Sequence, residues 1–268
     1  MRQFVRPRPV DDPALRFIGF HHAGGSAAVL HPLARRLPPD WDALLLDLPG
    51  RGKRRSEPLI RDMDQLVDRV VRDVAGCTDA PYVLFGHSMG AILAIEVGRR
   101  LTAAGEPPGW VGVSGRSAPL TPVAGSRRLS EHSDAELFDT LLALGGMPER
   151  INDVPELKEY FLRVVRADFQ AVDSYRPAAD RLPLRCPLTA FGGISDAWAP
   201  PASLPAWEYE TLAPFRQCFL PGGHFYFVES DVAALAREVR TEVRTAFALV
   251  GTDAGTLMMA GPFGPSSG

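Results

Sequence analysis

The chain has 268 residues, of which 46% are hydrophobic, which is enough apolar material for one large core and favours a single domain. Its formal charge of −3 gives no reason to expect nucleic acid or an anionic membrane as a partner. There is no run of about 18 apolar residues that could span a membrane, and no apolar stretch of the signal-peptide kind follows Met1. We therefore expect a cytoplasmic protein.

Strands and helices alternate through the first part of the chain. Residues 1–14 are rich in proline and charge, and predict an irregular arm with at most a short edge strand. Apolar runs predict strands at 15–20, 41–46, 82–85 and 110–114, and apolar spacings near 3.6 residues predict helices at 30–37, 63–74 and 89–101. This alternation is typical of a mostly parallel sheet that helices cover on both faces.

The alternation is interrupted between residues 116 and 185, where helices are predicted at 137–144 and 156–175. We interpret this insertion as a lid over the active-site edge of the sheet, not as a second domain. Strands resume at 187–191 and 215–220, and a closing helix is predicted at 232–247. Residues 1–250 are thus expected to form one domain, followed by a disordered tail from 251 to 268 that contains Gly, Ser and Pro.

The three cysteines, Cys77, Cys186 and Cys218, have neither metal-site spacing nor an even number for a disulfide framework. Each lies within or beside an apolar segment. We therefore expect buried free thiols in a reducing compartment.

The segment Gly86-His87-Ser88-Met89-Gly90 lies between an apolar run and a second run that is rich in helix formers. A Gly-x-Ser-x-Gly motif between a strand and a helix is the nucleophile elbow of the α/β-hydrolase fold. Gly86 and Gly90 remove side chains that would collide at so tight a turn, so that Ser88 can present its Oγ outward from a strained backbone. Ser88 is therefore the predicted nucleophile.

A serine nucleophile needs a base and an acid that orients the base, and in this fold the chain order is serine, acid, histidine. Two histidines follow Ser88. His132 lies in the predicted lid, whereas His224 follows the last strand in a glycine-rich loop, so His224 is the predicted base.

Asp196 is the predicted acid, because it follows the strand at 187–191 and so lies at the correct edge of the sheet. Asp231 is the alternative. Three further aspartates, Asp168, Asp173 and Asp180, lie in or near the lid helices and are expected to be solvated or to cap helices.

The oxyanion hole needs two backbone N–H donors. Met89, directly after the nucleophile, is predicted to supply one, and Ala23 in the small-residue loop after the first main strand is predicted to supply the other. Adjacent His21 and His22 resemble a metal pair, but neighbouring histidines cannot easily share a metal, and no Cys or carboxylate cluster follows them. We expect neither a metal nor a cofactor.

A short basic loop contains Arg51, Lys53, Arg54 and Arg55. We expect its side chains to form a solvated surface with salt bridges. The alternative is a contact with a phosphorylated or acidic partner.

The chain resembles the type II thioesterases that accompany polyketide synthases and nonribosomal peptide synthetases. The resemblance covers residues 15–250 approximately, and His21 departs from it because the family commonly has proline there. It rests on six segments, of which the fifth lies in the lid: His22-Ala23-Gly24-Gly25-Ser26, Leu48-Pro49-Gly50-Arg51-Gly52, Gly86-His87-Ser88-Met89-Gly90, Ser114-Gly115-Arg116, Arg166-Ala167-Asp168-Phe169 and Pro221-Gly222-Gly223-His224-Phe225.

The resemblance implies an α/β-hydrolase fold and the hydrolysis of acyl thioesters on the phosphopantetheine arm of a carrier protein, which removes stalled or wrongly primed acyl groups. Ser88 would attack the carbonyl, His224 would act as the base, and Asp196 would orient the imidazolium. The partner would be an acyl carrier or peptidyl carrier protein, and the enzyme would act as a monomer. Candidates for the apolar inner side of the lid are Leu137, Phe138, Leu141 and Met147.

Three other functions remain open, of which one is a chain-terminating thioesterase domain of the kind that is normally fused to a synthase. A carboxylesterase or lipase would use the same triad on small or lipid esters, and relative turnover of acyl-carrier protein, acyl-CoA and a simple ester distinguishes it. A hydrolase-fold binding module without activity is the alternative outside catalysis. Labelling of Ser88 by a fluorophosphonate distinguishes that function.

Overall fold

The computed structural model describes residues 3–121, 128–145, 151, 153–229 and 232–257. In this part of the chain the strands are β1 (Phe4–Val5), β2 (Leu15–Phe20), β3 (Trp41–Leu46), β4 (Tyr82–His87), β5 (Val111–Ser114), β6 (Leu188–Gly193) and β7 (Phe215–Leu220). The α-helices are α1 (His31–Ala34), α2 (Met63–Val74), α3 (Met89–Ala103), α4 (Asp134–Leu144), α5 (Pro155–Ser174), α6 (Tyr226–Glu229) and α7 (Val232–Leu257).

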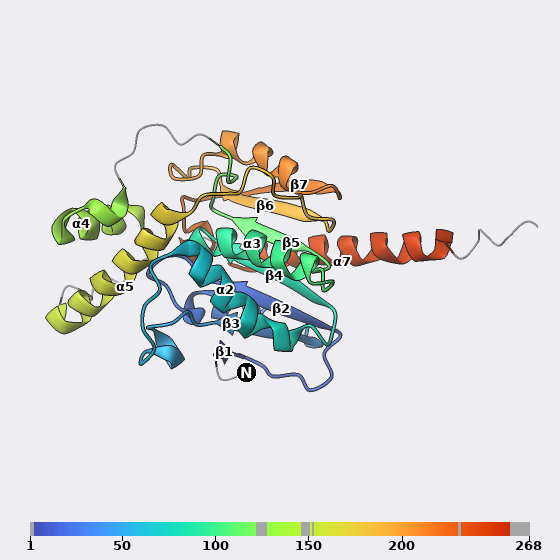
Figure 1. Ribbon diagram of the computed structural model, residues 1–268, viewed down its shortest axis with the longest axis horizontal. Coiled ribbons are helices and arrows are strands. Elements are labelled where there is room, and N and C mark those ends of the chain that lie inside the picture. Colours follow the sequence, from blue (N-terminus) through green and yellow to red (C-terminus); the bar gives the residue numbers. More distant parts are fainter. Residues whose placement is uncertain (1–2, 122–127, 146–150, 152, 230–231, 258–268) are drawn as a thin grey trace, which may run out of the picture.

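The strands form one sheet in the order β1-β3-β2-β4-β5-β6-β7 (Figure 1). Every neighbouring pair is parallel except the edge pair β1 and β3. Strands β2 to β6 are buried along their whole length, which is typical of parallel strands between two helical layers. The predicted α/β-hydrolase fold is confirmed, and the N-terminal arm supplies a short edge strand.

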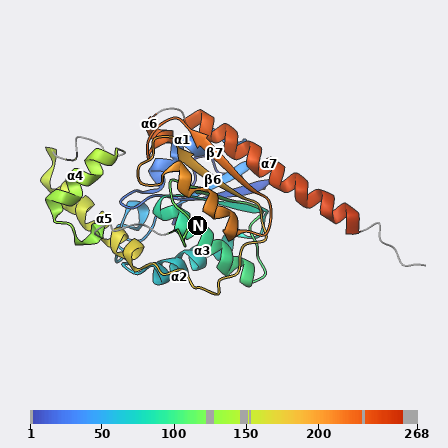
Figure 2. The same cartoon turned by 90° about the horizontal axis from the view of Figure 1, so that it is seen from above.

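Helices cover both faces of the sheet, with α2 and α3 on one side and α1 and α7 on the other (Figure 2). Each layer closes its own apolar core: Val70 of α2 and Ile95 of α3 belong to the first, and Leu33 of α1 and Val239 of α7 to the second. Helix α3 is apolar nearly all round because it packs on β4 and β5 and also on α2.

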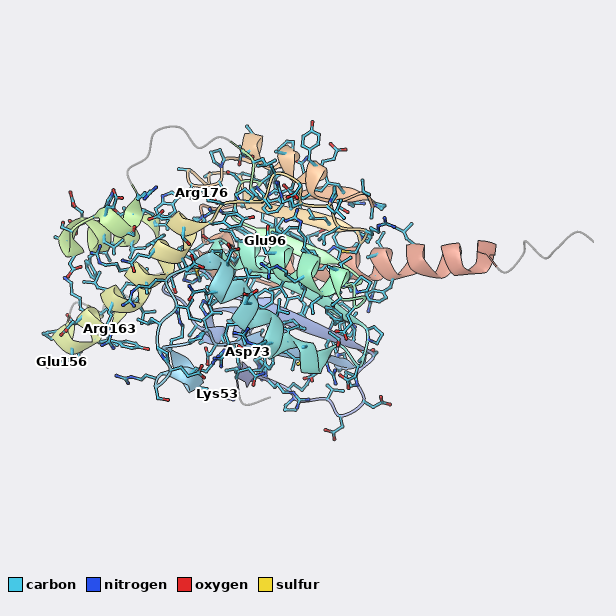
Figure 3. All side chains as sticks on the ribbon, viewed as in Figure 1. Lys53, Asp73, Glu96, Glu156, Arg163 and Arg176 are labelled. Carbon is cyan, nitrogen blue, oxygen red and sulfur yellow. The ribbon has the colours of Figure 1, made fainter. Side chains whose placement is uncertain are left out.

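Helices α4 and α5 form the predicted lid, which lies beyond one end of the sheet, away from the free end of α7 (Figures 1 and 2). Figure 3 shows Glu156 and Arg163 on the half of α5 that is farther from the sheet. The second half reaches the main core at Ala171. Between them the lid helices enclose a third apolar cluster, made of Leu137, Phe138, Leu141, Ile151, Leu162, Val165 and Phe169.

Two helices differ from the prediction. The helix expected at 30–37 is only one α-helical turn, α1, which a 3-10 helix at Ala27–Leu30 precedes. Pro38 disfavours helical backbone at Leu37, the residue before it. Helix α7 continues past Gly251 to Leu257, since extending an existing helix is much easier than starting one. Residues 258–268 of the predicted tail lie outside the described residues.

The cysteines are free thiols, as predicted, with Cys77 and Cys186 buried and Cys218 only half-buried. Burial raises the pKa of the Cys186 thiol to about 12. No helix in the described ranges is both long enough and apolar enough to cross a membrane.

Candidate active site

The nucleophile elbow has the strained backbone that its motif predicts. Ser88, between β4 and α3, has φ 56° and ψ −112°, and among the described residues it is the one non-glycine with positive φ. A Cβ on Gly86 would collide with the carbonyl group of Gly90, and a Cβ on Gly90 would collide with that of Phe20. The two glycines therefore allow the turn to close and keep Ser88 in this conformation.

His224 and Asp196 are hydrogen-bonded to each other in the buried part of the site. Nδ1 of His224 lies 2.9 Å from Oδ2 of Asp196, and Oδ1 of Asp196 accepts the N–H groups of Trp198 (2.8 Å) and Ala199 (3.0 Å). Burial by itself raises the pKa of Asp196, but the hydrogen bond from His224 and the backbone donors outweigh it, so the pKa lies below its ordinary value. Asp196 is therefore ionised near neutral pH and can orient the His224 ring.

Ser88 and His224 line the same cavity, whose volume is about 250 Å³. No hydrogen bond joins Ser88 Oγ to the His224 ring within the described residues. Such bonds are often long before substrate binds and shorten afterwards. The structure thus brings together the predicted nucleophile, base and acid, while Asp231 lies outside the described residues.

The lid forms the other wall of this cavity, through apolar side chains that include Leu141, Phe161 and Phe169. Of the predicted inner-side residues, Leu141 lines the cavity, whereas Leu137 and Phe138 pack within the lid's own core. Met147 lies outside the described residues. The cavity is therefore polar at Ser88 and His224 and apolar on the lid side.

The oxyanion loop, residues 21–26, follows β2 and places Ala23 on the cavity wall. Met89 is the first residue of α3, and within the described residues neither its N–H nor that of Ala23 donates a hydrogen bond to the protein. The His22 carbonyl holds the loop in shape, accepting the N–H of Gly25 at 3.0 Å and Nδ1–H of His21 at 2.7 Å. Both predicted oxyanion donors are thus available to a ligand.

His21 supports the oxyanion loop through its ring. One of its ring nitrogens donates to the His22 carbonyl. Burial, together with the nearby charge of Arg51, lowers the pKa of His21 to about 3, so the ring is neutral. The described ranges contain no group of three or more His, Cys, Asp or Glu residues that could hold a metal ion.

His87 has a structural role that the sequence analysis missed. Its Nδ1 lies 2.9 Å from Ser114 Oγ, which in turn lies 2.7 Å from the hydroxyl of Tyr226. The His87 ring centroid is 4.9 Å from that of His224, and burial holds the pKa of His87 well below its usual range. A buried chain of hydrogen bonds therefore joins the elbow to β5 and to the segment after His224. In the sequence, this role of His87 was indicated by its position inside the Gly-x-Ser-x-Gly motif.

The prediction of a solvated surface with salt bridges is wrong for two of the four residues of the basic loop, whereas Lys53 and Arg55 are exposed as predicted. Arg51 is buried against Asp168, which was itself expected to be solvated or to cap a helix. Arg54 is also buried and pairs with Glu57 at 2.8 Å and with Asp73 of α2 at 2.6 Å. Arg51 and Asp168 are 117 residues apart in sequence, so nothing local marks them as partners.

The chain is similar to thioesterases over most of its length, and residues 16–243 match a family model described as a thioesterase domain. The gramicidin S biosynthesis protein GrsT of Aneurinibacillus migulanus is 33% identical over 230 residues, which cover 85% of this chain and 88% of that protein. A probable cadicidin biosynthesis thioesterase of Streptomyces griseus is 34% identical over 228 residues, and the match covers 85% of this chain but 62% of that relative.

A solved structure, that of the type II thioesterase BorB from the borrelidin biosynthetic cluster, is similar in fold as well as in sequence. It has a TM-score of 0.82 and 34% sequence identity, and the match covers 91% of this chain and 98% of BorB.

Proposed function

The chain belongs to the thioesterase family, as its motifs predicted, and from this premise we propose that it hydrolyses acyl thioesters held on the phosphopantetheine arm of a carrier protein. The observation that carries the proposal is the single cavity lined by Ser88, His224 and Ala23 on one side and by apolar lid side chains on the other. The relatives' names, which refer to thioesterases and to the biosynthesis of cadicidin, gramicidin S and borrelidin, support an acyl thioester as the substrate.

The reaction proposed for this site has two halves. In the first, His224 Nε2 takes the proton of Ser88 Oγ as that oxygen attacks the thioester carbonyl carbon, and the N–H groups of Ala23 and Met89 stabilise the oxyanion. The C–S bond then breaks, the sulfur takes the proton from His224 and leaves as the pantetheine thiol, and an acyl–Ser88 ester remains.

In the second half, His224 takes a proton from water as the water oxygen attacks the ester carbonyl carbon. A second oxyanion forms in the same hole. Its collapse breaks the bond to Ser88 Oγ, which regains the proton from His224, and the free carboxylic acid leaves. Asp196 stabilises the imidazolium in both halves.

We further infer that the partner is an acyl carrier or peptidyl carrier protein of a polyketide synthase or nonribosomal peptide synthetase, and that the enzyme removes stalled or wrongly primed acyl groups from it. We place this activity in the cytoplasm, with the enzyme as a monomer and without a cofactor. The apolar lid wall supports an acyl chain as the bound group.

The proposal is tested by mass spectrometry of carrier proteins loaded with a series of acyl groups. We expect acyl loss with the parent and none above background with Ser88→Ala. Acyl-CoA and a simple ester are assayed in parallel. Faster turnover of the ester than of every thioester would indicate a carboxylesterase instead, and a folded parent whose Ser88 is not labelled by a fluorophosphonate would indicate a binding module.

A further inference from the structure

The lid contacts the oxyanion loop through one buried carboxylate. Asp168, in the second half of α5, accepts the backbone N–H of Gly24 on Oδ2 at 2.7 Å. Arg51, in the loop after β3, donates to both oxygens of this carboxylate, with Nη2 2.7 Å from Oδ1. Asp168 is 1% exposed and Arg51 4%. Three segments that are distant in sequence therefore meet at Asp168.

The backbone of Gly24 also packs directly against α5. Gly24 has φ 76°, and a Cβ added to it would lie 2.8 Å from Cγ2 of Val165. Val165 and Asp168 are three residues apart and so lie on one face of the helix. This face of α5 packs against the loop through Val165 and accepts the N–H of Gly24 through Asp168. Gly24 directly follows Ala23, so both contacts act next to the proposed oxyanion donor.

Stability alone does not account for an ion pair at this place. Two apolar side chains of similar size usually stabilise a core as well as a buried ion pair does, or better. An acceptor here has a specific use, because it fixes the backbone next to a proposed oxyanion donor. A lone carboxylate would disfavour the oxyanion that forms nearby, and the guanidinium of Arg51 offsets that charge.

On the basis of the reaction proposed above, we propose that Arg51 and Asp168 are positioning residues that hold the N–H of Ala23 in the oxyanion hole. The pair gives the N–H of Gly24 an acceptor without adding net charge. Because α5 carries that acceptor, the hole is complete only while α5 is seated on the oxyanion loop. The lid thereby contributes to transition-state stabilisation as well as enclosing the acyl chain.

Two uncharged double variants provide the main test. Arg51→Met with Asp168→Asn keeps an acceptor oxygen for Gly24, whereas Arg51→Met with Asp168→Leu removes it. We expect the second to have a kcat about 10- to 100-fold below that of the first with KM unchanged, because the oxyanion is bound only in the transition state. Its melting temperature is expected to differ little, since the better packing of the apolar pair offsets the loss of an acceptor for the Gly24 N–H.

A single variant tests the charge argument. Arg51→Met alone leaves an unpaired carboxylate beside the oxyanion, so its kcat is expected to lie below that of Arg51→Met with Asp168→Asn. Asp134→Asn is the matched control. Asp134 of α4 pairs at 2.6 Å with Arg166, which lies in α5 like Asp168, but this pair does not contact the oxyanion loop. Its kcat is expected to equal that of the parent.

All variants are measured on a simple ester and by the rate at which a fluorophosphonate labels Ser88, because the phosphonyl oxygen occupies the same hole. Equal kcat in the Asn and Leu double variants, or losses confined to KM or to melting temperature, would overturn the positioning role. A parent that cleaves the ester but no carrier thioester refutes the proposed substrate instead, and the variant series on the ester still decides the role of Arg51 and Asp168.

Discussion

At Ser88 the backbone conformation costs stability and serves the proposed chemistry. A non-glycine residue in such a sparsely populated region is disfavoured by about 1–3 kcal/mol. Ser88 keeps it because its N–H donates to the Ser114 carbonyl at 2.7 Å and because α3 begins at the next residue. The same turn leaves the N–H of Met89 at the start of a helix, where it has no intrahelical partner and can stabilise an oxyanion.

Replacing Asp196 by Asn should reduce kcat by about 10²- to 10⁴-fold with little change in KM. The Asn oxygen can still accept the N–H groups of Trp198 and Ala199, which leaves the side-chain NH₂ towards Nδ1 of His224. His224 would then carry its proton on Nε2 and could not accept that of Ser88. Steady-state kinetics on a loaded carrier protein measure the effect.

Asp180→Asn is the control for this variant, because Asp180 is an exposed aspartate that precedes β6. Its kinetics should match those of the parent. Parent-like turnover by Asp196→Asn would show that Asp196 does not orient the base.

Residues marked by a local pattern were predictable, and residues paired over long separations were not. The glycine spacing identifies Ser88, and the chain order identifies Asp196 and His224. In the structure Ser88 and His224 line one cavity, and Asp196 is hydrogen-bonded to His224 behind it. Arg51 and Asp168 carry opposite charges 117 residues apart, and a charged side chain in a sequence is by default assigned to the surface. Only the fold shows that each buries the other.

Among the elements, the strands were the most predictable. Strands that lie between two helical layers are rich in apolar residues, and the predicted bounds 15–20 and 41–46 are those of β2 and β3. The predicted bounds 215–220 are those of β7, an edge strand that is partly exposed. The short 3-10 helices at Pro201–Ser203 and Pro205–Glu210, and the single turn α6, were missed. Pieces of one or two turns are too short to show an apolar period.

Helix α4 depends on the lid's own core. Within the described residues it contributes side chains to the third apolar cluster and to neither of the main cores. Leu137→Ala removes buried side-chain atoms from this cluster and should lower the free energy of local unfolding of α4 by about 2–5 kcal/mol. We expect faster hydrogen exchange of the backbone amides in Asp134–Leu144, with those of α3 unchanged, as measured by mass spectrometry.

Leu93→Ala is the matched control, since Leu93 is equally buried but lies in a main core. It should lower the melting temperature of the whole protein. If Leu137→Ala also accelerates exchange throughout α3, the lid is not an independent unit of stability.

At the scale of the whole molecule, the site is assembled by the common direction of the strands. The loop after β2 carries Ala23, the loop after β3 carries Arg51, the turn after β4 carries Ser88, and the loops after β6 and β7 carry Asp196 and His224. Parallel strands end at the same edge, so five connections distant in sequence meet there, as ligand sites of open α/β sheets do.

Two buried, neutral histidines, His21 and His87, also lie at this edge, and they make the stability of the fold depend on pH. The pKa of His21 is about 3 in the folded protein and that of His87 is well below its usual value, in both cases first because of burial. An unfolded chain protonates histidine below a pH of about 6.5. Between that pH and about 3 the unfolded state binds protons that the folded state does not, so stability falls as the pH falls.

Each such histidine should lower the free energy of unfolding by about 1.4 kcal/mol per pH unit in this window. His21→Phe removes one of them in a ring of similar size, and should reduce the dependence of stability on pH by about that amount between pH 6 and pH 4.5, roughly. Urea unfolding at several pH values measures it, with Ser88→Ala as the control that changes the site without removing a histidine. A slope in His21→Phe equal to that of the parent would mean that His21 is protonated in the folded state, in which case its Nε2, which is buried and has no partner among the described residues, must gain one.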